Sequence, residues 1–234
     1  MGSNYSYNNK LTYGVDLVFC IDATESMYPF LDTVKENALN FYQDFKRVMD
    51  QKGKPVIQLR VKIIAFRDYL ADGDQAMLET GFYVLPTEAE AFRDAVESIV
   101  ADGGGDDPED GLEAVAFAIK RSQWSNAGIR NRHVIVVWSD DGAHPLGFCK
   151  NAPNYPKNMA KDFEELTAWW GTKSAPGLMD EYAKRMLIFA PDFYGWREIR
   201  NNWNKVIHYI SDSAGDGLRE CDYDAILSAI SNTI

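Results

Sequence analysis

The segment Val15-Asp-Leu-Val-Phe-Cys-Ile21 is followed at once by Asp22-Ala-Thr-Glu-Ser-Met27, and these two segments decide the expected fold. The first is a nearly continuous apolar run, which is typical of a strand buried on both faces in a parallel sheet. The second is polar and tightly spaced, which indicates a loop at the carboxyl end of that strand. Because ligands of open α/β sheets bind at this end of the strands, the loop is the first candidate for a functional site.

Further strands are expected along the chain. Residues 133–138 and 186–190 are also short apolar runs, and 206–210 is a shorter strand pattern. Residues 57–63 alternate apolar and polar side chains, which is the period of a half-exposed strand nearer an edge of the sheet. Residues 82–85 are expected to form a short partner strand.

Between these runs apolar residues recur every three or four positions, which is the spacing of an amphipathic helix. Such stripes run along residues 30–48, 92–99 and 112–119, and a last helix is expected at 222–234. Strand and helix patterns therefore alternate. This alternation predicts an α/β fold, with a doubly wound, mostly parallel sheet and helices on both of its faces.

The length of 234 residues favours one domain over two very small ones. Residues 1–12 are expected to form a flexible tail and 13–234 a single domain, with an irregular insertion at about 143–179. That insertion contains the adjacent pair Trp169 and Trp170. The pair could anchor an interface, but the favoured interpretation places one ring in the core and leaves the other partly covered.

The composition argues against several classes of partner. The 24 Lys and Arg residues against 35 Asp and Glu residues give a net charge of −11, which repels phosphate backbones and argues against nucleic acid. The sequence contains no apolar run of about 18 residues, so it predicts no membrane span, and its N-terminus has no signal-peptide pattern. The three cysteines, Cys20, Cys149 and Cys221, form neither a zinc-binding pattern nor a disulfide framework. We therefore expect a reduced, cytoplasmic protein without a membrane partner.

Oxygen-bearing side chains follow two of the predicted strands. Asp22, Thr24 and Ser26 occupy alternate positions in the first loop, and Asp140 and Asp141 follow the strand at 133–138. Carboxylates and hydroxyls suit Mg²⁺, Mn²⁺ or Ca²⁺ rather than zinc.

A third loop, Gly103-Gly-Gly-Asp-Asp-Pro-Glu-Asp110, leads into a helix pattern. Its glycines let the backbone turn tightly and approach a ligand, and its acids crowd the helix start. Each loop alone has an ordinary explanation as a turn, a helix cap or a partner of the helix dipole. Gathered at one edge of the sheet, however, so many carboxylates would repel one another, and a divalent cation is the simplest neutraliser.

The three loops, in this order, resemble the metal-ion-dependent adhesion site (MIDAS) of von Willebrand factor type A (vWA) domains. Asp22-x-Thr24-x-Ser26 resembles the first loop of the family, Asp-x-Ser/Thr-x-Ser. Gly103-Gly-Gly-Asp106 resembles the second loop, and Ser139-Asp140 resembles the third. The resemblance covers residues 13–234, nearly the whole chain.

The resemblance implies a divalent cation, with Mg²⁺ as the expected ion and Mn²⁺ or Ca²⁺ as alternatives. The metal ligands that it implies are Asp22, Thr24, Ser26, Asp106 and Asp140. Accessory ligands could come from Asp107, Glu109, Asp141 and His144. Which of the acids in the second loop points inward stays open, and Asp106 is the first choice.

The second loop departs from the usual family pattern, because Asp106 stands where a threonine is common. This form is similar to a bacterial and protist branch, whose members include domains attached to, or encoded beside, protein kinases and phosphatases. A carboxylate in place of a hydroxyl would lower the charge at the metal. The ion should then attract an acidic partner less strongly.

The function that the resemblance implies is ligation rather than catalysis. The chain is expected to be a metal-dependent protein-binding module and not an enzyme, with an acidic residue of a partner completing the coordination, in a kinase and phosphatase signalling set. One alternative is a Mg²⁺-dependent phosphohydrolase with Asp22 as its nucleophile. Thr24 counts against it, because haloacid dehalogenases need a second aspartate there. Another alternative is a metal with a purely structural role.

Several residues near the expected site keep open roles. Arg67 and Asp68, after the alternating strand, could brace the site or pair with each other. His144 lies near the predicted rim and could contact a partner or a ligand. His133 and His208 lie in strand patterns and are expected to be structural.

Overall fold

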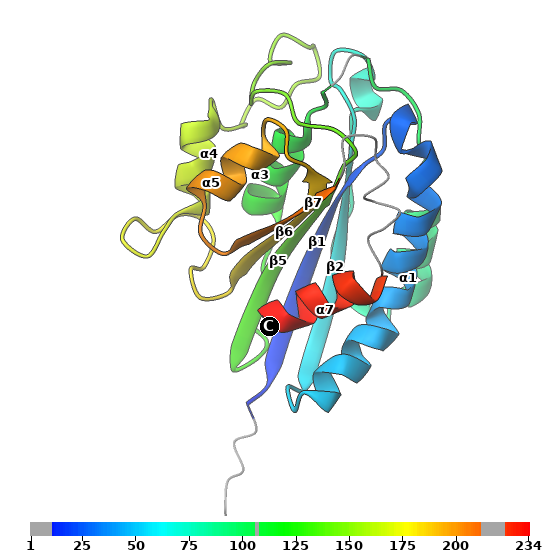
Figure 1. Ribbon diagram of the computed structural model, residues 1–234, viewed down its shortest axis with the longest axis vertical. Coiled ribbons are helices and arrows are strands. Elements are labelled where there is room, and N and C mark those ends of the chain that lie inside the picture. Colours follow the sequence, from blue (N-terminus) through cyan, green and yellow to red (C-terminus); the bar gives the residue numbers. More distant parts are fainter. Residues whose placement is uncertain (1–10, 106–107, 212–222) are drawn as a thin grey trace, which may run out of the picture.

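The computed structural model describes residues 11–105, 108–211 and 223–234. Its centre is one sheet with the strand order β3-β2-β1-β5-β6-β7, in which β4 also pairs with β2 (Figure 1). β1, β2, β5, β6 and β7 are mutually parallel, and only β3 and β4 run antiparallel to β2. The strand bounds are β1 Tyr13–Asp22, β2 Val56–Phe66, β3 Met77–Glu79, β4 Tyr83–Leu85, β5 Arg130–Trp138, β6 Lys184–Pro191 and β7 Val206–Ser211. The predicted mostly parallel sheet is therefore confirmed.

Strand β1 lies at the point where the strand order reverses. Its neighbours are β2 on one side and β5 on the other, and every residue of β1 is buried. Phe19 faces one core cluster and Val18 the other, which explains why the segment reads as a continuous apolar run. In doubly wound sheets this reversal opens a crevice at the carboxyl ends of the strands, and it places the end of β1 there.

Helices cover both faces of the sheet, as predicted. The helices α1 (Tyr28–Gln51), α2 (Ala89–Glu97) and α7 (Tyr223–Thr233) contribute to the core cluster of one face. The helices α3 (Gly111–Arg121), α4 (Phe163–Trp170) and α5 (Trp196–Asn202) contribute to the core cluster of the other face (Figure 1). Two short 3₁₀ helices, η1 (Glu25–Met27) and η2 (Gly73–Gln75), lie in the loops at the carboxyl edge.

Strand β3 and helix α5 are among the elements that had no expected counterpart. Strand β3 is only three residues long, which is too short to show a period. Helix α5 begins after Gly195, whose φ is +90°, and the Glu198 side chain accepts a hydrogen bond from the Gly195 amide over 2.7 Å. This local cap starts a short helix in which Trp196 and Ile199 are buried. Trp203, which follows the last residue of the helix, is buried as well.

The segment 143–179, which the sequence predicts to be an irregular insertion, contains α4 and the tryptophan pair. Trp170 is buried and donates a hydrogen bond from its indole nitrogen to the Asn204 carbonyl over 3.0 Å. Trp169 is half-buried, and the Lys120 ammonium lies 4.2 Å from its ring centre. One ring in the core and one partly covered is therefore the arrangement found.

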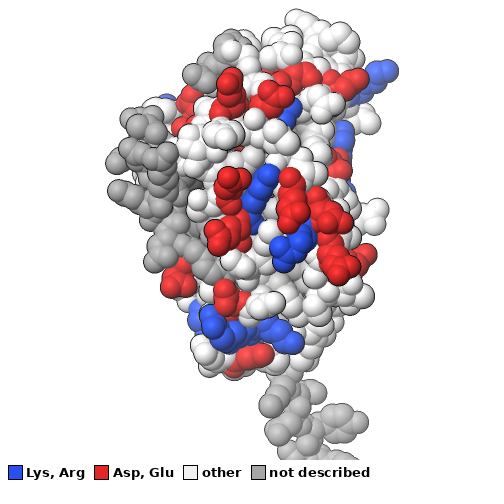
Figure 2. All heavy atoms as spheres, turned by 90° about the vertical axis from the view of Figure 1, so that its right-hand side faces the viewer, with Lys and Arg blue, Asp and Glu red and all other residues white. Residues whose placement is uncertain are grey.

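Several predictions fall outside the described residues. These are the first ten positions of the expected tail, together with Asp106, Asp107 and Cys221. Among the described helices, none combines the length and the apolar character that a membrane crossing requires. Figure 2 shows acidic and basic side chains interspersed over much of the face that it displays.

Candidate metal centre

Asp22 is the last residue of β1 and its side chain is completely buried. Its Oδ1 accepts hydrogen bonds from the Thr24 amide over 3.1 Å and from the Thr24 hydroxyl over 2.6 Å. Its Oδ2 accepts one from the Ser139 hydroxyl over 2.7 Å. Burial first, and then the nearby charge of Asp140, raise the pKa of Asp22 to about 7.

The first and third loops meet through Ser26. Its hydroxyl lies 3.1 Å from the Thr24 hydroxyl and donates a hydrogen bond to Asp140 Oδ1 over 3.1 Å. Ser26 is exposed, whereas Asp22 and Thr24 are buried. The structure thus brings Asp22, Thr24, Ser26 and Asp140 together into one group of oxygens, here called the oxygen cluster, that runs from the core to the surface.

The second loop approaches the same place. Gly104 has a φ of +81°, and a Cβ on it would lie 2.8 Å from Glu109 Oε1 and 3.1 Å from Thr24 Cβ. Glycine therefore permits both the turn and the close approach to Thr24. The Glu25 amide also donates to the Gly103 carbonyl over 3.1 Å. Glu109 lies beside the oxygen cluster, while Asp106 and Asp107 are outside the described residues.

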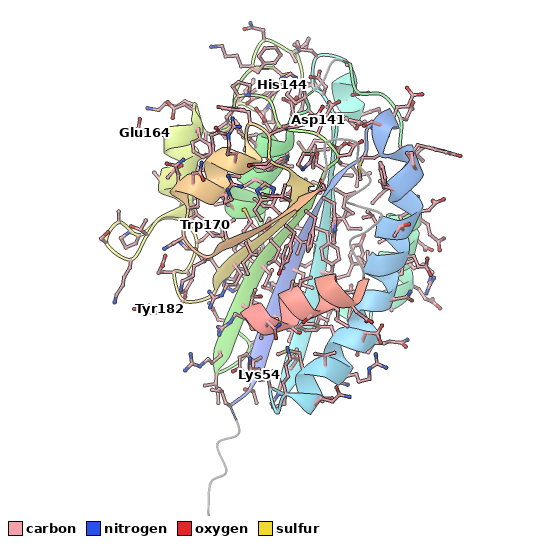
Figure 3. All side chains as sticks on the ribbon, in the orientation of Figure 1. Lys54, Asp141, His144, Glu164, Trp170 and Tyr182 are labelled. Carbon is pink, nitrogen blue, oxygen red and sulfur yellow. The ribbon has the colours of Figure 1, made fainter. Side chains whose placement is uncertain are left out.

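The other predicted accessory residues have different surroundings. Asp141 Oδ1 accepts a hydrogen bond from the Gly142 amide over 2.6 Å, so this side chain caps its own turn. His144 Nε2 lies 3.1 Å from Asp68 Oδ2, so the imidazole contacts Asp68 rather than the oxygen cluster. Figure 3 labels Asp141 and His144 at the upper edge of the sheet, where the parallel strands end.

Residues that were not among the predicted ligands hold the loops in place. Ser139 orients Asp22 through a hydrogen bond. Its position directly before Asp140 is the sequence feature that could have identified it as a residue of the site. Arg67 donates from Nε to the Ala23 carbonyl over 3.0 Å and from Nη2 to the Val100 carbonyl over 2.7 Å. Of the two roles considered for Arg67, bracing the site is therefore the one observed.

Comparison with known proteins gives the fold. No family model matches the chain, and no curated protein matches it. Proximal thread matrix protein 1 from the mussel byssus matches with a TM-score of 0.51 and 11% identity, over 93% of this chain and 46% of that one. Its structure with a zinc-occupied MIDAS motif matches with a TM-score of 0.52 and 10% identity, over 93% and 46%. The pilus adhesin SpaC from Lactobacillus rhamnosus GG matches with a TM-score of 0.52 and 13% identity, over 93% and 30%.

These similarities define a vWA-like α/β fold, in agreement with the resemblance of the three loops. The chain spans less than half of the length of each of these solved proteins. At such low identity the similarity concerns the fold alone. Assignment to the kinase-associated branch stays a prediction from the sequence.

Proposed function

We propose that this chain is a metal-dependent protein-binding module. In this proposal, a divalent cation at the carboxyl edge of the sheet is held by the oxygen cluster together with Asp106, and an acidic side chain of a partner completes its coordination. The observation that carries the proposal is the unbroken series of contacts from buried Asp22, through Thr24, to exposed Ser26 and half-buried Asp140.

The surroundings of Asp22 support a cation. Its hydrogen-bond donors are one amide and the hydroxyls of Thr24 and Ser139, all of them neutral. A buried carboxylate near a second carboxylate, that of Asp140, is costly without a positive charge. Hydroxyl and carboxylate oxygens are hard ligands, so Mg²⁺ is the expected ion and Mn²⁺ or Ca²⁺ the alternatives. When bound, the ion supplies a Lewis-acidic position for a partner's oxygen.

Exposed aromatic rings near the oxygen cluster support a protein partner. Tyr28 follows the first loop directly and is 76% exposed. Phe193 and Tyr194 are 40% and 37% exposed, and they lie against Gly142 in the third loop. Aromatic side chains are enriched at protein interfaces, where they bury much area at low entropic cost. Solved proteins of similar fold include an adhesin and a matrix protein.

The proposed role requires no catalytic base. His144, which follows Asp140 by four positions, directs its Nε2 to Asp68 instead. We therefore propose that the chain is not an enzyme. A cytoplasmic setting and a place in kinase and phosphatase signalling complete the proposal, and both rest on the sequence.

Affinity capture from a native lysate, in Mg²⁺ and in EDTA, tests the proposal. The variants are Asp22→Ala and, as a matched control, Asp32→Ala, which removes an exposed acid of α1. A partner should be retained in Mg²⁺ by the wild type and by Asp32→Ala. EDTA or Asp22→Ala should release it.

Other outcomes identify the alternatives. Turnover of a phosphomonoester that disappears in Asp22→Ala would instead establish a phosphohydrolase. A rise in the unfolding temperature with Mg²⁺, without any Mg²⁺-sensitive partner, would instead establish a structural metal. Tyr28→Ala should keep Mg²⁺ binding and weaken retention of the partner, which separates the interface from the ion.

A further inference from the structure

A second group of metal-ligand side chains lies near the same edge of the sheet. Asp68 follows β2, whereas His144 and Cys149 lie in the segment after β5, and all three are buried. One ligand atom from each lies within 4.8 Å of the others. Asp68 Oδ2 lies 3.1 Å from His144 Nε2 and 3.5 Å from Cys149 Sγ. The three are here called the mixed-donor cluster.

The spacing of these atoms fits a tetrahedral ion. Bonds of about 2.0–2.3 Å from zinc to oxygen, nitrogen and sulfur place neighbouring ligand atoms about 3.3–3.8 Å apart. The 3.5 Å from Asp68 Oδ2 to Cys149 Sγ lies within this range, and the 3.1 Å from Asp68 Oδ2 to His144 Nε2 is slightly shorter than its lower end. A set with one thiol, one imidazole and one carboxylate selects a borderline-soft metal, unlike the oxygen cluster.

A neighbouring carboxylate gives a second, independent indication of a missing cation. Asp110 is completely buried, and its Oδ2 accepts a hydrogen bond from the Tyr69 amide over 2.7 Å. Its Oδ1 accepts no hydrogen bond of normal geometry within the described part of the chain. Asp110 and Asp68 both interact with the Cys149 thiol, so both carboxylates lie near that sulfur.

Little positive charge compensates these acids. Among the described residues, the ion pair of Asp68 is with His144, whose imidazole would be charged only if protonated. The nearby Arg67 directs its guanidinium to the carbonyls of Ala23 and Val100 instead. Two buried carboxylates with one histidine are therefore short of a cation.

We propose that Asp68, His144 and Cys149 bind a zinc ion, with Asp110 beside the fourth coordination position. Because the ligands are buried, the ion would be structural, in contrast to the exchangeable ion proposed for the oxygen cluster. It would tie the loop after β2 to the segment after β5, next to the start of α3. The thiol would lose its proton to solvent on binding, as metal-bound cysteines do.

Zinc content and cobalt substitution test this site. After dialysis against excess Mg²⁺, zinc should remain in the wild type and in Asp22→Ala, and it should be lost from Cys149→Ser. Cobalt-loaded protein should show a thiolate-to-metal charge-transfer band in the near ultraviolet. Cys20→Ala is the matched control, because Cys20 is a buried thiol whose Sγ lies 3.8 Å from the Ala114 carbonyl, and it should keep the band.

The possible results are distinct. Zinc that is lost in Asp22→Ala but kept in Cys149→Ser would place the ion in the oxygen cluster and overturn the inference. Absence of the charge-transfer band in folded wild-type protein would overturn it as well, without any variant. If Cys149→Ser does not fold, the zinc content of His144→Gln is measured instead. Zinc retained in the His144→Gln variant would contradict the site. None of these results depends on a partner, so they are separate from the test of the protein-binding function.

Discussion

Ser139 donates a hydrogen bond to Asp22 across 2.7 Å, and it thereby joins the residue after β5 to the last residue of β1. The strand register explains the contact, because Ile21 pairs with Trp138 and the next residue of each strand follows at the same edge. One oxygen of Asp22 is thus fixed by Ser139 and the other by Thr24. The carboxylate has a defined orientation before any ion arrives.

We expect Ser139→Ala to weaken Mg²⁺ binding by roughly 10–100-fold, the usual effect of losing a hydrogen bond that orients a ligand. Isothermal titration calorimetry measures it. Ser125→Ala is a matched control, because the Ser125 hydroxyl also donates a hydrogen bond to a buried aspartate of β1, Asp16, over 3.2 Å. Equal losses in the two variants would contradict a specific role for Ser139.

Asp22→Asn should separate the metal role of Asp22 from its structural role. The amide keeps the shape of the side chain but removes the charge that Asp140 and burial disfavour. In EDTA the unfolding temperature should equal or exceed that of the wild type, whereas the rise caused by Mg²⁺ should vanish. Thermal unfolding followed by fluorescence measures both. A Mg²⁺ response that persists in this variant would contradict the assignment of Asp22.

Gly104→Ala should abolish Mg²⁺ binding. A Cβ at this position would collide with Glu109 Oε1, at 2.8 Å, and crowd Thr24. Gly53→Ala is the matched control, since Gly53 has a similar φ of +67° but no described residue beyond its chain neighbours within 4 Å of the place that a Cβ would take. Both variants carry the cost of a positive φ, roughly 1 kcal/mol, and Gly104→Ala should lose about 1–3 kcal/mol more. Urea unfolding and calorimetry test the difference.

Glu113→Gln should flatten the dependence of stability on pH. Burial, and next the charge of Asp110, raise the pKa of Glu113 from 4.5 to about 8 in the folded protein. Between those values the unfolded chain releases a proton that the folded protein keeps, so stability falls as pH rises, by up to about 1.4 kcal/mol per pH unit. The gain of the variant over the wild type should therefore grow from pH 4.5 to about 8.

Urea unfolding across that pH range measures this gain. Glutamine can keep the contacts of Glu113 Oε1 with the Gly147 amide and the Tyr155 hydroxyl. The exposed Glu36 of α1 provides the control, and Glu36→Gln should leave the pH profile unchanged. A wild-type profile that is retained in Glu113→Gln would show that another group is responsible.

Local patterns account for much of the fold. The apolar run in β1 indicates a strand that is buried on both faces, and the apolar stripe in α1 indicates a helix with one buried face. Both elements can therefore be predicted from the sequence. Strand β3 does not, because three residues carry no period and its place is set by pairing with β2. Helix α5 depends on a local cap at Gly195 that a hydrophobic pattern cannot report.

The residues of the two proposed sites also differ in whether the sequence predicts them. Asp22, Thr24 and Ser26 are close in the chain, so their spacing predicts a shared loop, and Asp140 follows from the rule about strand ends. The mixed-donor cluster has no such signal, since Asp68 is far in sequence from His144 and Cys149. Only the fold brings these three together, and the absence of a zinc spacing in the sequence therefore did not exclude a metal site of this kind.

The position of β1 has a consequence for hydrogen exchange. This strand has a paired neighbour on each side and packed helices on each face, so its amide protons should be among the last to exchange with solvent. The loop that begins at Ala23 follows the carboxyl end of β1 directly, where the amide protons exchange slowly. Binding of a cation to the oxygen cluster should therefore slow amide hydrogen exchange in the loop, while the amides of β1 keep their exchange rates. The ion would then stabilise the loop at the end of the strand and leave the strand itself unchanged.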